Sequence, residues 1–252
     1  MISLIICSVD EEKFRRVADN YRRALCDEPF EIIRVRNAPG MAAGYNEGFA
    51  RSHGDIVIFS HDDVHLLTPH LAPLLRRHLN TYDVLGIAGT TKLQGGQWIL
   101  SGPPYVYGQV ATPNYDEGIF EVAIWGAPAK GVGGIKALDG VFLCARREVV
   151  DKVPFDERTF RGFHLYDIDF TFRAYLAGFK LGVCCDLHLV HSSPGNFDDQ
   201  FYDQQDLFME KHRAALDEGA ERVFNITLLK ANSLAEVSEV MTPPHWTNSR
   251  EQ

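Results

Sequence analysis

An apolar run that ends in acidic and imidazole side chains is the first chemically informative feature of the sequence. Residues 56–64 read IVIFSHDDV, so a predicted strand is followed at once by a histidine and two aspartates. Adjacent carboxylates repel each other, and a strand that presents Asp62 and Asp63 together usually faces a metal ion, an arginine or solvent. The pair alone leaves these three choices open.

A second imidazole strengthens the metal interpretation. His191 ends the run KLGVCCDLHLVH, which is also typical of a strand. Hard divalent cations such as Mg²⁺ and Mn²⁺ bind carboxylate oxygens and leave positions open for phosphate, and imidazole suits Mn²⁺ better than Mg²⁺. Asp62, Asp63 and His191 are therefore candidate ligands of a metal that carries a diphosphate.

Two further aspartates lie in the segment FRGFHLYDIDFTFRA, which is expected to contain a helix. Asp167 and Asp169 are two residues apart, so on a helix they point about 200° apart and cannot share one task. If one faces a cleft, the other caps the helix or pairs near its start, where the helix dipole favours negative charge. The cleft-facing aspartate could act as a general base, and the residues alone leave open that both are caps.

The elements that must position these residues follow a βαβ order in the first part of the chain. Short apolar runs alternate with amphipathic segments, which favours an open, mainly parallel sheet whose ligands bind beyond the carboxyl ends of its strands. The expected strands are 3–9, 30–36, 55–60 and 84–89, and the expected helices are 11–25, 41–52 and 69–79.

The pattern changes between residues 90 and 134. Glycines, prolines and aromatic residues without a sustained period predict a loop-rich excursion that forms a binding wall or a lid. The alternative is one or two peripheral β-hairpins whose aromatic side chains pack on the sheet. After this segment we expect a strand and helix over 138–150, a helix over 165–178, a strand over 180–191, a helix over 198–216 and a loosely held tail from residue 242.

Composition excludes several classes of protein. The 252 residues carry 34 acidic and 25 basic side chains, a net charge of −9, without a long block of Lys or Arg, which argues against a nucleic-acid partner. No window reaches the roughly 18 uninterrupted apolar residues of a transmembrane segment. Five cysteines without CxxC spacing are expected to be reduced, and the absence of a leader-like start predicts a cytoplasmic protein.

Three segments read in series resemble the family 2 glycosyltransferases. They are NAPGMAAGYNEGFARSHGDIVIFSHDDV, LDGVFLCARREVV and FDERTFRGFHLYDIDFTFRAYLAGFKLGVCCDLHLVHSSPG, and the resemblance extends from residue 3 to about residue 197. It implies an α/β protein with the Rossmann-like GT-A fold, a mainly parallel central sheet flanked by helices, and a loop-rich insertion on the acceptor side. We expect one domain over 1–252, with a nucleotide-sugar half (1–90), an acceptor and catalytic half (91–200) and a C-terminal helix and tail (201–252).

The resemblance also implies roles for the acidic residues. Asp62 and Asp63 match the place of the family's DxD-type motif, although Ser60 stands where many members have its first aspartate. Asp167 matches the catalytic base of the ED motif, in which Tyr166 replaces the usual glutamate. His191 resembles the histidine that completes metal or diphosphate binding in many GT-A enzymes.

Four more residues are expected to contact the donor. Asn46 and Gly48 match a helix start near the nucleotide, and Asn37, after the second strand, could bond a base edge where many members have an acidic pair. Asp139, in LDG, could hold a sugar hydroxyl or simply cap a strand.

The resulting hypothesis is an inverting glycosyltransferase that needs Mn²⁺ or Mg²⁺. It would transfer a sugar from a nucleotide-diphosphate donor, with UDP-sugar favoured, to a glycan or another hydroxyl-bearing acceptor. The alternatives are a catalytically silent nucleotide- or sugar-binding module of the same fold and a glycoside hydrolase, because paired carboxylates also cleave glycosides. A homo-oligomer and a place beside a membrane glycan-assembly pathway stay open.

Overall fold

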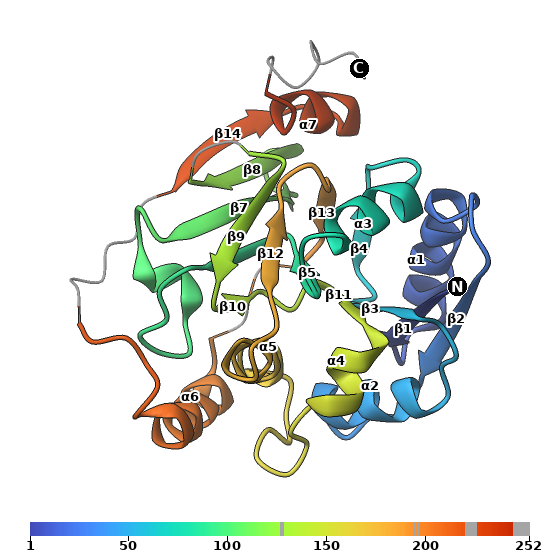
Figure 1. The fold of residues 1–252 in the computed structure, drawn as a ribbon. Coiled ribbons are helices and arrows are strands. Elements are labelled where there is room, and N and C mark those ends of the chain that lie inside the picture. Colours follow the sequence, from blue (N-terminus) through green and yellow to red (C-terminus); the bar gives the residue numbers. More distant parts are fainter. Residues whose placement is uncertain (127–128, 194, 196, 220–225, 244–252) are drawn as a thin grey trace.

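The computed structural model describes residues 1–126, 129–193, 195, 197–219 and 226–243 (Figure 1). Its main sheet has seven strands in the order β2-β1-β3-β11-β5-β12-β9. Their bounds are β1 (Ile2–Cys7), β2 (Phe30–Val35), β3 (Ile56–Ser60), β5 (Val84–Gly86), β9 (Gly131–Ile135), β11 (Phe142–Arg146) and β12 (Leu181–Cys184).

The main sheet is mainly parallel, as expected. Strand β1 pairs in parallel with β2 and β3, and β5 pairs in parallel with β12. Strand β11 is antiparallel to both β3 and β5, so β5 runs in the direction of β3, and β9 is antiparallel to β12. Only β9 and β11 therefore oppose the other strands of this sheet.

The helices that flank this sheet present an apolar stripe to it, whereas α7 (Leu234–Val240) packs on a second sheet. In α1, Val17, Tyr21 and Ala24 are buried at helical spacing, and the Asp10 carboxylate caps the helix by accepting the N–H groups of Glu12 and Lys13. The helices are α1 (Glu11–Ala24), α2 (Met41–Ala50), α3 (Leu71–Leu79), α4 (Arg147–Lys152), α5 (Tyr166–Leu176), α6 (Asp199–His212) and α7 (Leu234–Val240), with a 3₁₀ turn η1 (Trp98–Ser101).

A second sheet takes up part of the expected loop-rich excursion. Residues 106–114 and 119–125 form the long β7–β8 hairpin, which matches the alternative in which aromatic residues pack on a sheet, since Trp98 and Trp125 are buried edge to face, whereas residues 91–105 form a loop around a 3₁₀ turn. The sheet has the order β10-β6-β7-β13-β4, with β8 paired to β7 and β14. Its strands are β4 (Val64–Leu66), β6 (Ala88–Thr90), β7 (Val106–Asn114), β8 (Ile119–Trp125), β10 (Ala137–Leu138), β13 (Leu189–His191) and β14 (Thr227–Ala231).

Two runs expected as single strands are each divided between the sheets. The run 84–89 breaks at Ile87 into β5 and β6, and the run 180–191 breaks near Asp186 into β12 and β13. The Asp186 carboxylate accepts bonds from Arg77 (2.6 Å) and His78 (2.7 Å) of α3, which holds the chain at the second break. At these two breaks the chain passes from one sheet to the other, and both sheets contribute residues to one hydrophobic core.

The C-terminal part has a shorter first helix than expected, followed by a strand and a helix that were not expected. Helix α6 ends at His212 rather than near residue 216, and β14 and α7 follow it. The expected loose tail falls mostly on residues 244–252, which lie outside the described residues. None of the described helices is both long and apolar enough to cross a bilayer.

Candidate active site

The turn between β3 and β4 and the end of β13 form the centre of the site. Because β4 and β13 pair with His191 opposite Val64, His191 is brought beside Asp63, with 3.3 Å between Nε2 and Oδ1. His61 joins them, with its Nδ1 3.4 Å from His191 Nε2. One ligand atom from each of His61, Asp63 and His191 lies within 4.8 Å of the others, which is a donor set that fits a divalent cation.

This group differs from the expected one by a single residue. Asp62, expected as a ligand, is placed in the wall of an adjacent cavity, and His61 takes its place in the group. In the sequence, His61 is the histidine before the aspartate pair, and no role was expected for it. It lies in the turn between β3 and β4, and its partners His191 and Tyr166 are 130 and 105 residues away, so local spacing gave no signal for its place.

Electrostatics keep Asp63 ionised and favour the neutral form of His61. Burial acts to raise the pKa of Asp63, but hydrogen bonds from His191 and Ser193 outweigh it and hold the pKa well below its usual range. Burial and the neighbouring His191 lower the pKa of His61. A carboxylate with neutral imidazoles is the protonation state that binds a metal.

Tyr166 contacts the ring nitrogen of His61 that does not face His191. Its hydroxyl lies 2.8 Å from His61 Nε2, and so the other ring nitrogen, Nδ1, faces His191. A second partner of this kind sets the tautomer and orientation of a metal-binding histidine. The residue that replaces the family's glutamate is thus joined to the candidate metal centre.

We therefore expect Tyr166→Phe to weaken Mn²⁺ binding by about 10- to 100-fold while the protein stays folded, because only one hydroxyl is removed. Calorimetric titration of Mn²⁺ measures this. Tyr45→Phe is the matched control, since Tyr45 is buried in the same aromatic cluster, with its ring centre 5.6 Å from that of Tyr166. Equal Mn²⁺ affinity of Tyr166→Phe and the wild type would contradict the role of the hydroxyl.

Two cavities open on either side of this centre. The first, of about 370 Å³, is lined by the end of β1 together with Lys13, Arg36 and Asp62. The second, of about 440 Å³, lies between η1, the β10–β11 turn and the start of α5. The two share His61, Phe163 and Ser193, so the metal group stands in their common wall.

Asp167 lines the second cavity near the start of α5. Gly140 permits its position, because a Cβ there would lie 2.7 Å from Asp167 Oδ2 and 2.6 Å from the Tyr166 hydroxyl oxygen. Burial, followed by the charge of Asp139, raises the pKa of Asp167 to about 7. A carboxylate with that pKa is suited to accept a proton near neutral pH.

Asp139 lies in the same cavity but is partly engaged. Its carboxylate accepts the indole N–H of Trp98 (3.1 Å) and the backbone N–H of Val141 (3.0 Å). The capping role and a place at the cavity wall, which the sequence analysis set against each other, therefore coexist.

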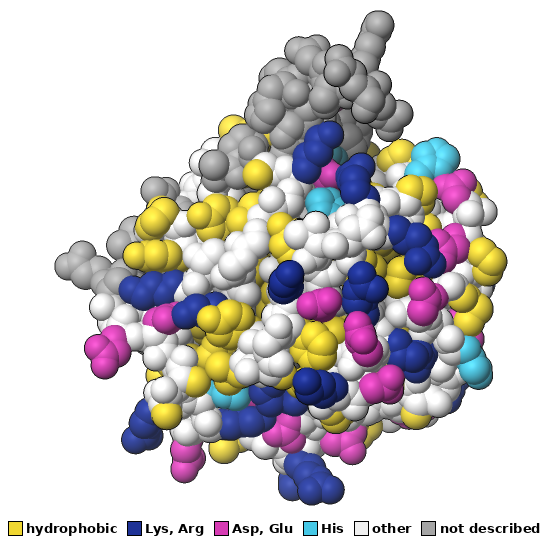
Figure 2. Space-filling view, in the orientation of Figure 1, with side chains coloured by type: hydrophobic (Ala, Val, Ile, Leu, Met, Phe, Trp, Pro, Cys, Tyr) yellow, Lys and Arg dark blue, Asp and Glu magenta, His cyan; other side chains and the backbone are white. Residues whose placement is uncertain are grey.

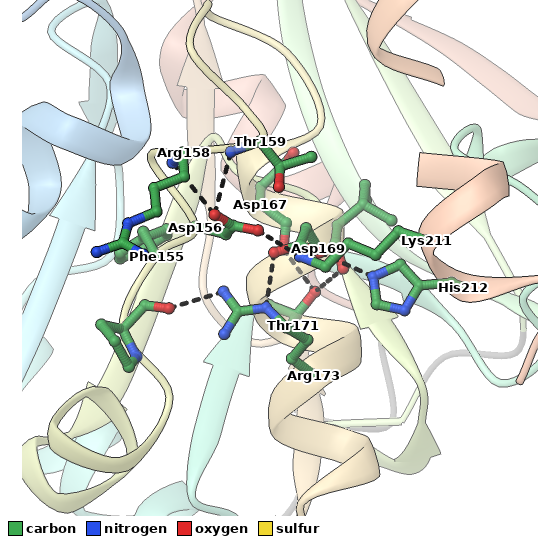
Figure 3. A network of polar contacts seen from close by, with 12 residues as sticks. Phe155, Asp156, Arg158, Thr159, Asp167, Asp169, Thr171, Arg173, Lys211 and His212 are labelled. Atoms are coloured by element: carbon green, nitrogen blue, oxygen red, sulfur yellow. Dashed lines mark hydrogen bonds and ion pairs between the residues drawn. The ribbon is translucent and has the colours of Figure 1, made fainter. Parts of the chain in front are cut away.

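Asp169 points to the opposite side of α5, as the two-residue spacing predicts. It is fully buried and accepts bonds from Arg173 (2.7 Å), Lys211 (2.6 Å) and His212 (2.8 Å), as Figure 3 shows. Lys211 also pairs with Asp156 at 2.7 Å. This network fastens α5 to α6, which lie side by side in Figure 1.

Two residues expected near the nucleotide make structural contacts. The Asn46 amide exchanges two hydrogen bonds with the backbone of Phe155 (2.9 and 3.1 Å), and Gly48 packs so closely on β1 that a Cβ would lie 2.3 Å from Ile5. Neither lines a cavity described above. Asn37 is exposed between Arg36 and Ala38, which both line the first cavity, so it stands at the cavity rim.

Charged side chains on the face shown in Figure 2 are mixed, with Lys and Arg interspersed among Asp and Glu. All five cysteines are free thiols, as expected.

Comparison with known proteins agrees with this architecture. A family model described as "Glycosyltransferase like family" matches residues 3–212, and no curated protein sequence matches the chain. Among solved structures, the chain resembles S. aureus TarS 1–349 in complex with UDP-GlcNAc, with TM-score 0.51 and 15% identity over 86% of this chain and 68% of that one. It also resembles GalNAc-T7 with UDP, GalNAc and Mn²⁺, with TM-score 0.50 and 11% identity over 83% of this chain and 47% of that one.

The chain thus spans about half of the GalNAc-T7 structure and two thirds of the TarS structure. At these sequence identities the two structures show only the fold of this chain, which is the GT-A fold. Since the family match covers most of the sequence, this protein belongs to the glycosyltransferase like family.

Proposed function

We propose that this protein is an inverting, metal-dependent glycosyltransferase that uses a UDP-sugar. The observation that carries the proposal is the arrangement of the site: a metal-type group of His61, Asp63 and His191 separates a cavity containing Lys13 and Arg36 from a cavity containing Asp167. A transferase needs this order, with a cation between a diphosphate and an activated acceptor hydroxyl.

The first cavity is assigned to the donor. Lys13 and Arg36 offer positive charge for a diphosphate, and Asp62 and Asn37 stand where they could contact the nucleoside. The choice of uridine is supported by the ligands named for TarS and GalNAc-T7, which are UDP-GlcNAc and UDP. His61, Asp63 and His191 would hold Mn²⁺ or Mg²⁺, which neutralises the charge that develops on the leaving diphosphate.

Asp167 is assigned as the general base. Its carboxylate accepts the proton of the acceptor hydroxyl while the hydroxyl oxygen bonds to the anomeric carbon. The bond from that carbon to the phosphate oxygen breaks, and UDP leaves with the electron pair. Attack from the face opposite the leaving group inverts the anomeric centre, and holding both substrates in line supplies part of the acceleration.

The free thiols support a cytoplasmic location.

The donor assignment is tested by calorimetric titration of UDP, GDP and dTDP with Mn²⁺ and again with EDTA. We expect UDP to bind only with the metal, and Asp63→Ala to weaken this binding at least about tenfold because it removes the one carboxylate of the metal group. Asp116→Ala, an exposed aspartate in the β7–β8 turn, is the control.

Binding that EDTA leaves unchanged would contradict the metal role. Metal-dependent UDP binding without transfer to any acceptor would favour the silent module. Cleavage of glycosides without nucleotide would favour a hydrolase.

A further inference from the structure

The two cavities differ in charge. The first contains Lys13 and Arg36, whereas no Lys or Arg is found among the described residues that line the second. The second cavity instead contains two carboxylates, those of Asp139 and Asp167. A phosphate, sulfate or carboxylate on the acceptor would meet like charge there without a fixed cation to offset it.

The histidines of the second cavity do not supply that cation. His61 and His191 belong to the group around Asp63. His164 lies with its Nε2 3.4 Å from Asp198 Oδ1. Each imidazole therefore already has a carboxylate in its group or beside it.

Several aromatic rings also line the second cavity. Phe163 is 57% exposed although it is a large apolar side chain, and it lines both cavities at their junction. Trp98 donates its indole N–H to Asp139, and the buried Phe201 lines the same cavity. An exposed aromatic ring beside carboxylate oxygens, which accept hydrogen bonds, suits a ligand with one apolar C–H face and several hydroxyl groups.

We propose that the acceptor is an uncharged carbohydrate. Its hydroxyl groups form hydrogen bonds with Asp139 and Asp167, and one of its C–H faces packs on the Phe163 ring. The inference rests on the proposed function, since it takes the second cavity as the acceptor site. It excludes phosphorylated, sulfated and uronic acid acceptors.

A glycan array tests the class of acceptor. The tagged chain of 252 residues, with UDP and Mn²⁺, is applied to neutral oligosaccharides and to phosphorylated, sulfated, sialylated and uronic acid glycans. We expect binding to be confined to neutral glycans, and to fall about 3- to 10-fold in Phe163→Ala but not in Phe163→Tyr, which keeps the ring. Tyr115→Ala, which removes another exposed aromatic residue in the β7–β8 turn, is the matched control and should bind as the wild type does.

UDP affinity measured by calorimetry on the same proteins separates the two proposals. Binding to anionic glycans, or no binding to neutral ones while UDP still binds, would overturn the inference and leave the donor assignment standing. An equal loss of UDP and glycan affinity in Phe163→Ala would overturn the acceptor role of the ring. Failure of the wild type to bind UDP would overturn the proposed function itself.

Discussion

We expect Asp167→Asn to lower the rate of sugar transfer by about 10²- to 10⁴-fold and to change UDP binding with Mn²⁺ less than about twofold. The amide keeps the size of the side chain but cannot accept the proton of the acceptor hydroxyl. The metal group and the donor cavity are separate from this carboxylate, so donor affinity should persist. Steady-state kinetics and calorimetry on one preparation measure both quantities, and a normal turnover would exclude Asp167 as the base.

The pH profile gives an independent check on the same residue. The base must be ionised, and burial together with Asp139 raises its pKa to about 7, so kcat/KM should rise with pH up to about 7 and then level off. Asp139→Asn removes the neighbouring charge and should move the rising limb to lower pH. A profile that does not move would show that Asp139 does not influence the base.

Asp169→Ala is expected to destabilise the protein by about 3–5 kcal/mol, because it removes a fully buried carboxylate and leaves Arg173 and the buried His212 without their acidic partner, whereas Lys211 keeps Asp156. For a chain of this size the melting temperature should fall on the order of 6–20 °C. Differential scanning calorimetry measures the shift. Asp203→Ala, an exposed aspartate on α6, is the control and should melt within about 2 °C of the wild type. A similar small shift for Asp169→Ala would show that the network contributes little.

The contribution of Asp169 should depend on pH in a defined direction. Burial acts to raise its pKa, but His212, Arg173 and Lys211 outweigh burial and lower it. A lowered pKa in the folded state means that the stabilisation is complete above the ordinary pKa of about 3.9 and is lost as pH falls through the folded value. The difference in stability between wild type and Asp169→Ala should therefore shrink in acid.

Local patterns were sufficient for the elements that carry the site. Strands β1 and β3, helices α1 and α2, and the opposite directions of Asp167 and Asp169 follow from periodicity that is visible in short windows. The same local patterns predicted that Asp63 and His191 lie at strand ends, and the structure brings these two residues together.

Long-range pairing set what the patterns missed. The breaks at Ile87 and Asp186 depend on which sheet each half joins, and that choice is made by partners far along the chain. Asn46 binds a backbone 109 residues away, so a motif-based role at the nucleotide could not be distinguished from a structural one. The role of His61 depends on its contact with Tyr166, 105 residues downstream.

The network around Asp169 also has a consequence for biosynthesis. Lys211 and His212 lie 42 and 43 residues after Asp169. A ribosome therefore completes helix α5 well before it adds the two residues whose side chains anchor α5. A nascent chain that ends before residue 211 contains Asp63, Asp167 and His191 but lacks those two anchors. The family match ends at residue 212, which is the last of them. The smallest active fragment should therefore extend through α6, beyond every residue assigned to the chemistry.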